Sequence, residues 1–335
     1  MLGLFSLLKR LQKCFIRLLL LLSGLWSVGA FYYTANLTGH WQVWGTVAYT
    51  LLLLVLYIAF RRGQITAAWD MGAIISVVIA HFIMLTPQEV FSKTDWQTPW
   101  LRRAHAIFDH QQITIYDVRN FRYRSAKEFD INYIAMQIDP DKVLHLDVAL
   151  SHWNGLEKVA HTMLTFSFSD GQHLAFSMET RVPQGKKQGL IPGLFKQYEL
   201  LMVVATEQDI FKLRTDHRQE ELYLYRTNAD KKQCREILVS LLQALNRQHS
   251  SPEFYNSITR NCTTSLTPIL RKLDPGFTDD IRLLLNGNSD ELLYDLGYLA
   301  HRPGESFTEL KKRRKVNQYI HCHPDYPSAI RTAIL

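Results

Sequence analysis

The sequence predicts an α+β domain that follows a membrane region of three transmembrane helices. Three apolar segments occupy the first 88 residues, and each approaches the length that a helix needs to cross a bilayer. Beyond residue 112, several short runs alternate between apolar and polar residues, as β-strands do, and helical patterns follow them. A cysteine among hydroxylated residues then marks a candidate reactive site.

The predicted membrane region covers residues 1–88. Its apolar segments are Leu18–Tyr33, Trp41–Phe60 and Met71–Leu85. A signal peptide is the alternative interpretation of the first segment. However, Phe31-Tyr32-Tyr33 stands where a signal peptide needs a small-residue cleavage site, and two further segments follow. We therefore expect three transmembrane helices.

Basic residues predict the orientation of these helices. Lys and Arg cluster before the first segment, and Arg61-Arg62 lies between the second and the third, whereas the Thr34–His40 loop carries neither residue type. By the positive-inside rule, the N-terminus and the Arg61-Arg62 turn are cytoplasmic. Three spans then place the soluble domain outside the cytoplasm.

The net charge of +7 favours acidic partners or contact with a membrane.

Residues 89–112 read as a linker, and residues 113–335 read as the soluble α+β domain. Alternating runs predict strands over Ile113–Arg124, Ile131–Asp139 and Leu144–Trp153. Apolar residues with helical spacing over Cys234–Gln248 predict an amphipathic helix.

Two further strands, within Ala160–Val182, predict a hairpin with a defined register. The residues that must share one apolar face are Leu164, Phe166, Phe168, Leu174, Phe176 and Met178. A two-residue Asp170-Gly171 turn would pair apolar with polar faces, whereas a three-residue loop Ser169-Asp170-Gly171, with Gly171 in the left-handed conformation, aligns them. That loop sets His161 opposite Glu179, close enough for a carboxylate to contact an imidazole.

The stretch Ser251–Leu273 contains the candidate nucleophile, Cys262. We expect one helix to begin near Pro252, and a second to begin at Cys262, which Asn261 precedes and Thr263 follows. A thiol at a helix start meets unpaired backbone N–H groups and the positive end of the helix dipole, which lower its pKa. The alternative is a buried cysteine that only packs, but its polar neighbours disfavour that interpretation.

Other polar residues offer weaker candidates. Glu179 has a purely structural alternative, in which it pairs with Arg181 or a distant lysine. His145, His152 and His173 are weaker candidates than His161 for a base. His321, Cys322 and His323 resemble a metal cluster only superficially, so we expect no metal and no cofactor. Spacing alone does not decide whether Cys234 and Cys322 form a disulfide.

Several of these motifs together resemble a known family. They are AHTMLTF around His161, the strand FSMETR, the stretch YELLMVVATEQDIFKLRT and FYNSITRNCTT around Cys262. In this combination they resemble the Lnb N-terminal periplasmic domain, over roughly Asp147–Leu273. That family is similar to bacterial lipoprotein N-acyltransferases. The order of His before Cys also resembles the circularly permuted papain-like (NlpC-type) fold of the lecithin:retinol acyltransferase family, in which an Asn-Cys dipeptide opens a helix.

The resemblance implies Cys262 as nucleophile and His161 as base, while Glu179 and Arg181 match the family's strand motif. It implies a thiol acyltransferase of the bacterial inner membrane, with its soluble domain in the periplasm. Such an enzyme would move an acyl chain from phospholipid to an amine, such as a lipoprotein N-terminus. We expect no nucleic-acid partner. A cysteine peptidase or amidase that acts on cell wall or envelope protein, and a non-catalytic membrane scaffold, are the alternatives.

Overall fold

The computed structural model describes residues 2–34, 39–62, 95–153, 159–265, 286–320 and 330–331, with single positions at 267, 271, 280 and 282. The chain forms two compact units. The first comprises residues 1–94 together with 188–197, and the second comprises residues 95–187 together with 198–335.

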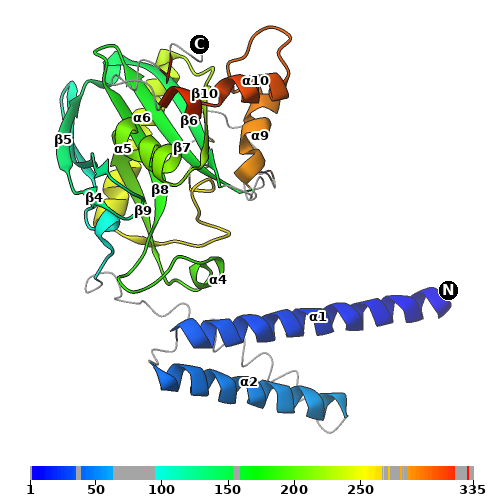
Figure 1. The fold of residues 1–335 in the computed structure, drawn as a ribbon. Helices are drawn as coiled ribbons and strands as arrows, with labels where there is room; N and C mark the ends of the chain where they lie inside the picture. Colours follow the sequence, from blue (N-terminus) through cyan, green and yellow to red (C-terminus); the bar gives the residue numbers. More distant parts are fainter. Residues whose placement is uncertain are drawn as a thin grey trace. The chain divides into compact units, whose positions relative to one another are not determined.

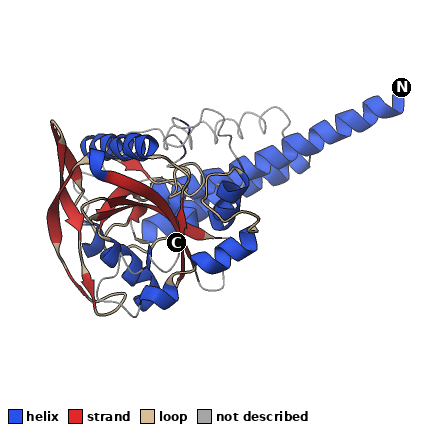
Figure 2. Ribbon diagram, turned by 90° about the horizontal axis from the view of Figure 1, so that it is seen from above, coloured by secondary structure: helices blue, strands red, loops and turns tan. Residues whose placement is uncertain are grey.

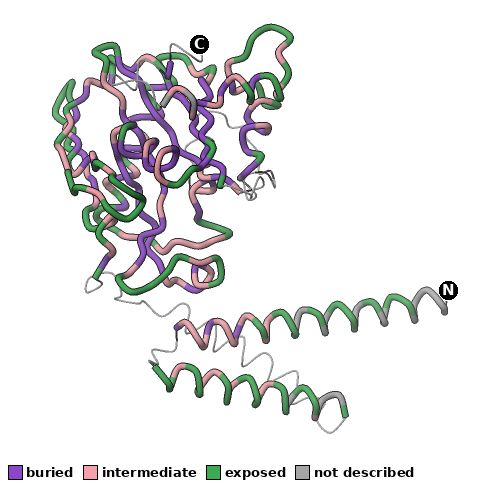
Figure 3. Tube along the Cα trace, viewed as in Figure 1, coloured by how far each residue is buried: buried purple, intermediate pink, exposed green. Residues whose placement is uncertain are grey.

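The first unit contains two long helices, α1 (Leu2–Thr34) and α2 (His40–Arg61), drawn in blue in Figure 1. The first two predicted spans lie within them, whereas the predicted third span, Met71–Leu85, lies outside the described residues. Within the described part of the chain, one helix is long and apolar enough to cross a membrane, over His40–Ala59 of α2. The residues described along α2 are exposed or half-buried (Figure 3). The other two predicted spans are therefore not confirmed.

The second unit is a mixed α+β fold built on one mixed sheet (Figure 1). Its strand order is β1-β2-β9-β8-β7-β6-β10, and β5 and β11 pair with β2 and β9 respectively. Only the β2–β9 pair is parallel among the described strands. The bounds of the strands in this sheet are β1 His105–Asp109, β2 Gln112–Arg119, β5 Tyr133–Ile138, β6 Val143–His152, β7 Ala160–Phe168, β8 His173–Arg181, β9 Glu199–Ala205, β10 Glu221–Arg226 and β11 Glu253–Phe254.

Short elements complete the structure. They are a two-stranded ribbon of β3 (Arg122–Tyr123) and β4 (Phe129–Asp130), and the helices α4 Leu190–Gly193, α5 Glu207–Lys212, α6 Lys231–Ser250, α9 Ser289–Asp295, α10 Phe307–Arg314 and α11 Asn317–Ile320. Three 3₁₀ turns, η2 Thr98–Trp100, η3 Pro140–Lys142 and η5 Asn286–Asn288, and one π-helical turn, η4 Leu213–His217, connect them.

The β7–β8 hairpin confirms the predicted register. Leu164 pairs with Phe176, and Phe166 pairs with Leu174. The amide of Phe168 donates to the carbonyl of Gln172 at 3.0 Å, so the loop has three residues. Gly171 closes it with a φ of +82°, which glycine adopts at no steric cost. The loop length therefore fixes which side chains of the two strands share a face, as the alternation requires.

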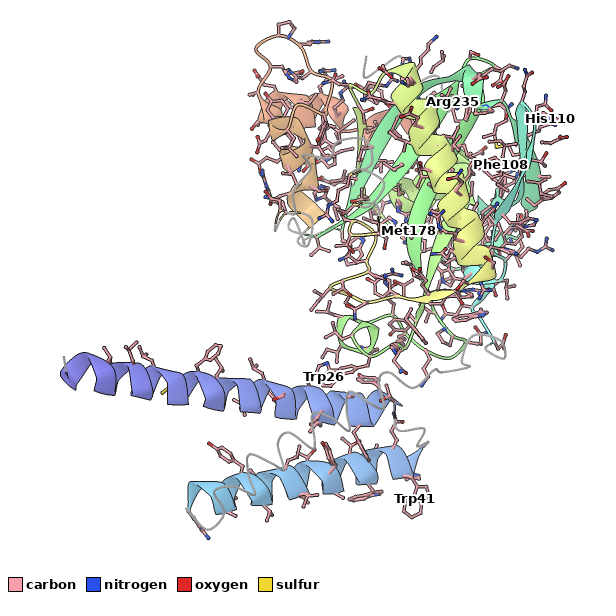
Figure 4. The ribbon with its side chains drawn as sticks, turned by 180° about the vertical axis from the view of Figure 1, so that it is seen from behind. Trp26, Trp41, Phe108, His110, Met178 and Arg235 are labelled. Carbon is pink, nitrogen blue, oxygen red and sulfur yellow. The ribbon has the colours of Figure 1, made fainter. Side chains whose placement is uncertain are left out.

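Helices cover both faces of this sheet (Figure 2). The amphipathic helix predicted over Cys234–Gln248 is α6, whose apolar residues pack on the six apolar side chains predicted to share a face. Figure 4 shows α6 crossing the sheet, with Arg235 near its N-terminal end. The opposite face is also buried, because Met163 and Ala175 pack against Ile210 and Phe211 of α5. The hairpin thus lies in the middle of a three-layer arrangement.

Two predicted segments differ from the structure. The linker predicted over 89–112 includes β1, because Ala106 belongs to the core and its strand pairs with β2. The helix predicted to begin near Pro252 does not form. Residues 253–254 instead extend the sheet as β11 beside β9, and Asn256 and Arg260 close a turn. Sheet hydrogen bonds from β9 therefore outweigh the local helical pattern.

The core position of Phe166 gives a test of this packing. Phe166 is fully buried, and its ring meets the ring of Phe176 edge-on at 5.7 Å. We expect Phe166→Ala to lower the free energy of unfolding by about 3–5 kcal/mol. Ile107→Ala, at a site 52% exposed, is the matched control and should change it by about 0.5 kcal/mol or less. Guanidinium unfolding in detergent measures both, and equal effects would contradict the described core.

Candidate active site

The β7 and β8 strands separate at one end of the hairpin. Their pairing runs from Ser167 opposite His173 to Met163 opposite Ser177. Beyond this point β7 continues its ladder with β6 as far as Ala160, and β8 continues with β9 as far as Arg181. Each strand therefore keeps its outer neighbour while the inner pair opens.

The turn that carries Cys262 contacts both strands at this opening. On the β7 side, the backbone amide of Thr162 hydrogen-bonds the Cys262 sulfur, and the Thr162 hydroxyl lies 3.3 Å from that of Thr263. On the β8 side, the Tyr255 hydroxyl hydrogen-bonds the Thr180 side chain. These contacts place the thiol where the two strands separate.

Asn261 shapes the backbone around the thiol. Its Oδ1 accepts hydrogen bonds from the amides of Thr263 and Thr264, both at 3.0 Å, and its own amide donates to the Thr264 hydroxyl at 2.9 Å. The Ser265 amide closes the turn by donating to the Asn261 carbonyl at 3.2 Å. These bonds are those of a helix N-cap, so Cys262 is the first residue of a helical turn, as predicted. Asn261 is a structural cap for the reactive position.

The imidazole of His161 joins the thiol to a carboxylate. Its Nε2 lies 2.6 Å from the Ser177 hydroxyl and 3.2 Å from Oε1 of Glu179. The Ser177 hydroxyl in turn donates to the same oxygen of Glu179 at 2.5 Å. A hydrogen bond also joins the imidazole of His161 to the Cys262 thiol. The structure thus brings together the three residues that the sequence singled out as nucleophile, base and carboxylate.

Arg214 completes the array, and sequence reasoning did not identify it. It comes from η4, its side chain is 3% exposed, and its Nη2 donates to Oε1 of Glu179 at 2.9 Å. A second bond, from Nη1 to the Ile210 carbonyl at 2.9 Å, fixes the guanidinium. The sequence did give one signal for each residue, because both lie in motifs that resemble the family. Arg214 lies in the FKLRT stretch, and Ser177 lies in FSMETR.

The charges of this array shift three pKa values. Burial lowers the pKa of His161, but the Glu179 charge and the hydrogen bonds to Cys262 and Glu179 together outweigh it and raise the pKa to about 9. Burial raises the pKa of the Cys262 thiol, yet the hydrogen bond and charge of His161 bring it below its ordinary value. The charges of His161 and Arg214 hold the pKa of Glu179 well below its usual range despite burial. This pattern favours a thiolate–imidazolium pair.

Arg181, predicted as a supporting residue, makes its contacts elsewhere. Its Nη1 pairs with Glu199 at 3.1 Å, and its Nε and Nη2 donate to the carbonyls of Trp100 and Leu101, both at 2.7 Å. Its guanidinium also lies 4.4 Å from the centre of the Trp96 ring. The structure therefore groups Arg181 with the segment that precedes β1 and not with Cys262.

Metal-binding residues do not gather in the described part of the chain: no group of three or more His, Cys, Asp or Glu side chains there could hold an ion. His321, Cys322 and His323 lie outside the described residues. Cys14, Cys234 and Cys262 are free thiols.

The shifted pKa values predict how alkylation of Cys262 depends on pH. Thiolate forms once the pH exceeds the lowered pKa of Cys262, and the imidazolium that stabilises it persists until the pH passes about 9. Cys262 should therefore react with iodoacetamide at a lower pH than an ordinary thiol does. Glu179→Gln removes the charge that raises the pKa of His161, so the onset of alkylation should move to higher pH. Peptide-resolved mass spectrometry measures the rates.

Two controls accompany this measurement. Glu128→Gln removes the same charge from an exposed site and should leave the profile unchanged. Cys234 is an internal reference, because burial raises its pKa to about 11 and its side chain is inaccessible. A Glu179→Gln profile identical to that of Glu128→Gln would refute the role assigned to the carboxylate.

Comparison with known proteins identifies a family whose model includes the residues of this site. Residues 130–287 match the family model described as the Lnb N-terminal periplasmic domain. No curated protein and no solved structure matches the chain. The match includes His161, Glu179, Arg214 and Cys262, together with the sheet and the turn that position them. The chain therefore carries a domain of the Lnb N-terminal periplasmic domain family and is a membrane-associated protein with a periplasmic domain.

Proposed function

We propose that this protein is a membrane-anchored thiol acyltransferase with a permuted papain-like catalytic domain. The observation that carries the proposal is the array in which Glu179 and Arg214 hold His161 against the lowered-pKa thiol of Cys262. A cysteine that only packs has no need of a buried ion-pair array directed at its sulfur.

In the first half-reaction, the Cys262 thiolate attacks the carbonyl carbon of an acyl ester and forms a tetrahedral oxyanion. The carbon–oxygen bond to the alcohol then breaks, and His161 gives its proton to the departing alcohol. The product is a thioester on Cys262, with His161 left neutral. Glu179 keeps the imidazole oriented and stabilises its protonated form between steps.

In the second half-reaction, an amine attacks the thioester carbonyl. His161 takes the proton that the amine loses, the carbon–sulfur bond breaks, and an amide forms as the thiolate returns. Water in place of the amine would give a carboxylic acid, which is the hydrolase outcome. The acceptor therefore decides between transferase and hydrolase, because both share the acyl-enzyme.

The oxyanion is stabilised by groups other than the amides at the start of the helical turn. The amides of Thr263 and Thr264 at the helix start already donate to Asn261. The donors that surround the sulfur are the backbone amide of Thr162 and the hydroxyl of Thr263, whose oxygen lies 3.8 Å from it. We assign oxyanion stabilisation to these two groups, which lie beside the position of the reacting carbon.

The substrates follow from the location of the domain. A membrane-associated protein with a periplasmic domain meets phospholipid as its most abundant acyl ester, and we propose phospholipid as donor. An amine on a lipoprotein N-terminus shares the same surface and is the proposed acceptor, with the bacterial inner membrane as the site of anchoring. The orientation rests on the basic residues Arg61 and Arg62 between the helices and the absence of Lys and Arg from residues 34–40.

Intact-protein mass spectrometry tests the proposal. The full chain, incubated with phospholipid vesicles, should gain the mass of one acyl group, which hydroxylamine removes as it does from thioesters. Cys262→Ala should show no adduct. Addition of a lipopeptide with a free amino terminus should discharge the adduct to an amide, whereas discharge to water alone would favour the hydrolase. Absence of any adduct from a protein whose Cys262 alkylates normally would overturn the proposal.

The base assignment has a separate prediction. His161→Ala should lower the rate of adduct formation by about 10²–10⁴-fold, because general acid–base catalysis contributes that much. His110→Ala, at a fully exposed histidine, is the matched control. The double variant His161→Ala/Cys262→Ala should be no worse than Cys262→Ala, since the two act as one unit. Turnover near normal in His161→Ala would show that another group is the base.

A further inference from the structure

Residues 188–197, which connect β8 to β9 and include α4, pack on α1 within the first compact unit. We call them loop 188–197. Phe195 is buried, and its ring stacks on that of Tyr33 at 5.3 Å and lies 6.2 Å from that of Trp26. Gln197 adds a hydrogen bond from Nε2 to the Tyr33 carbonyl at 2.9 Å. A Cβ on Gly29 would lie 2.4 Å from Phe195, so glycine permits this close packing.

Loop 188–197 packs on the C-terminal end of α1. That end contacts the N-terminal part of α2, where the candidate span starts. Gln42 donates to the Tyr32 carbonyl at 2.8 Å, and Phe31 stacks on Tyr49 at 5.0 Å. The candidate span begins at His40. Loop 188–197 therefore packs beside the end of α1 that adjoins the start of the candidate span.

Aromatic residues gather at this same end of the two helices. They are Trp26, Tyr32, Tyr33, Trp41 and Trp44, and Figure 4 labels Trp26 and Trp41 at the neighbouring ends of α1 and α2. Tryptophan and tyrosine are enriched where a membrane meets water. Trp41 and Trp44 are exposed, 77% and 65% respectively, as residues in contact with headgroups would be. This aromatic end marks the membrane interface independently of helix length.

The outer surface of loop 188–197 has the composition of an interfacial segment. Leu190 is 72% exposed and Ile191 is 59% exposed, among the most exposed apolar residues described. Lys186, Lys187 and Lys196 flank them, and no acidic residue occurs between Glu179 and Glu199. Apolar side chains beside lysines bind the boundary of an anionic bilayer, because the chains enter the acyl region and the ammonium groups meet lipid phosphates.

We propose that loop 188–197 is a lipid-surface element that inserts Leu190 and Ile191 into the interface of an anionic bilayer. The loop leads directly from β8, which carries Glu179, and back into β9. The identity of the acyl donor rests on the proposed function: insertion of the loop makes the donor phospholipid in a bilayer and not an acyl ester dissolved in water. The insertion itself does not depend on that function.

A spin label tests the insertion. The full chain, with Cys14, Cys234, Cys262 and Cys322 replaced by serine, carries Leu190→Cys or the control Leu296→Cys, at a site 45% exposed in the second unit. In vesicles of phosphatidylethanolamine and phosphatidylglycerol, the label at position 190 should be relaxed more by oxygen than by a water-soluble nickel chelate. The label at position 296 should show the reverse. Equal nickel access at both positions, or shielding of position 190 from both agents by a protein partner, would overturn the proposal.

An activity measurement with native cysteines separates this proposal from the proposed function. Leu190→Asp/Ile191→Asp should lose acylation of Cys262 by vesicle phospholipid about tenfold more than acylation by a water-soluble short-chain ester. Equal losses with both substrates would count against a lipid-surface role. Phospholipid that never acylates the wild-type chain would refute the proposed function. The insertion would still stand if the label of the Leu190→Cys variant is buried in lipid.

Discussion

The candidate site depends on keeping the carboxylate of Glu179 ionised where it is largely removed from water. A buried charge is tolerated only when partners replace its hydration, and removal of one partner costs about 3–5 kcal/mol in typical cases. Here the partners come from different elements: His161 from β7, Ser177 from β8 and Arg214 from η4. Satisfying the one carboxylate therefore fixes the relative positions of two strands and a turn. The thiol gains a protonated neighbour as a consequence of that requirement.

The sequence predicts the parts of this site that depend on short-range rules. Alternation of apolar residues, together with the length of the Ser169–Gly171 loop, gives the register that brings His161 near Glu179. The Asn-Cys dipeptide followed by threonines gives the turn, because an asparagine side chain can satisfy the first amides of a helix. Both inferences need only neighbours along the chain or across one hairpin. The structure confirms the predicted positions of these residues, whereas the chemistry assigned to them remains a prediction.

The remaining parts depend on contacts between distant segments, which periodicity does not encode. Arg214 reaches Glu179 across 35 positions of sequence, and the apolar periodicity around it gives no sign of this contact. The pattern after Pro252 suits a helix, but β9 offers free edge groups that pair with Glu253 and Phe254. Arg181 was grouped with Glu179 because they are two residues apart in one motif, yet its partner Glu199 lies on the next strand.

The separation of β7 and β8 divides the site into parts of unequal stability. His161 and Glu179 lie on strands that hydrogen-bond to β6 and β9 and are covered on both faces, so their exposure requires disruption of the central sheet. Cys262 belongs to a turn that Asn261 caps and that lies outside the strands of the sheet. Local opening of that turn would therefore need less free energy than global unfolding. Such a fluctuation would withdraw the thiol while the charges that activate it stay assembled, so the nucleophile can be removed and restored without refolding the domain.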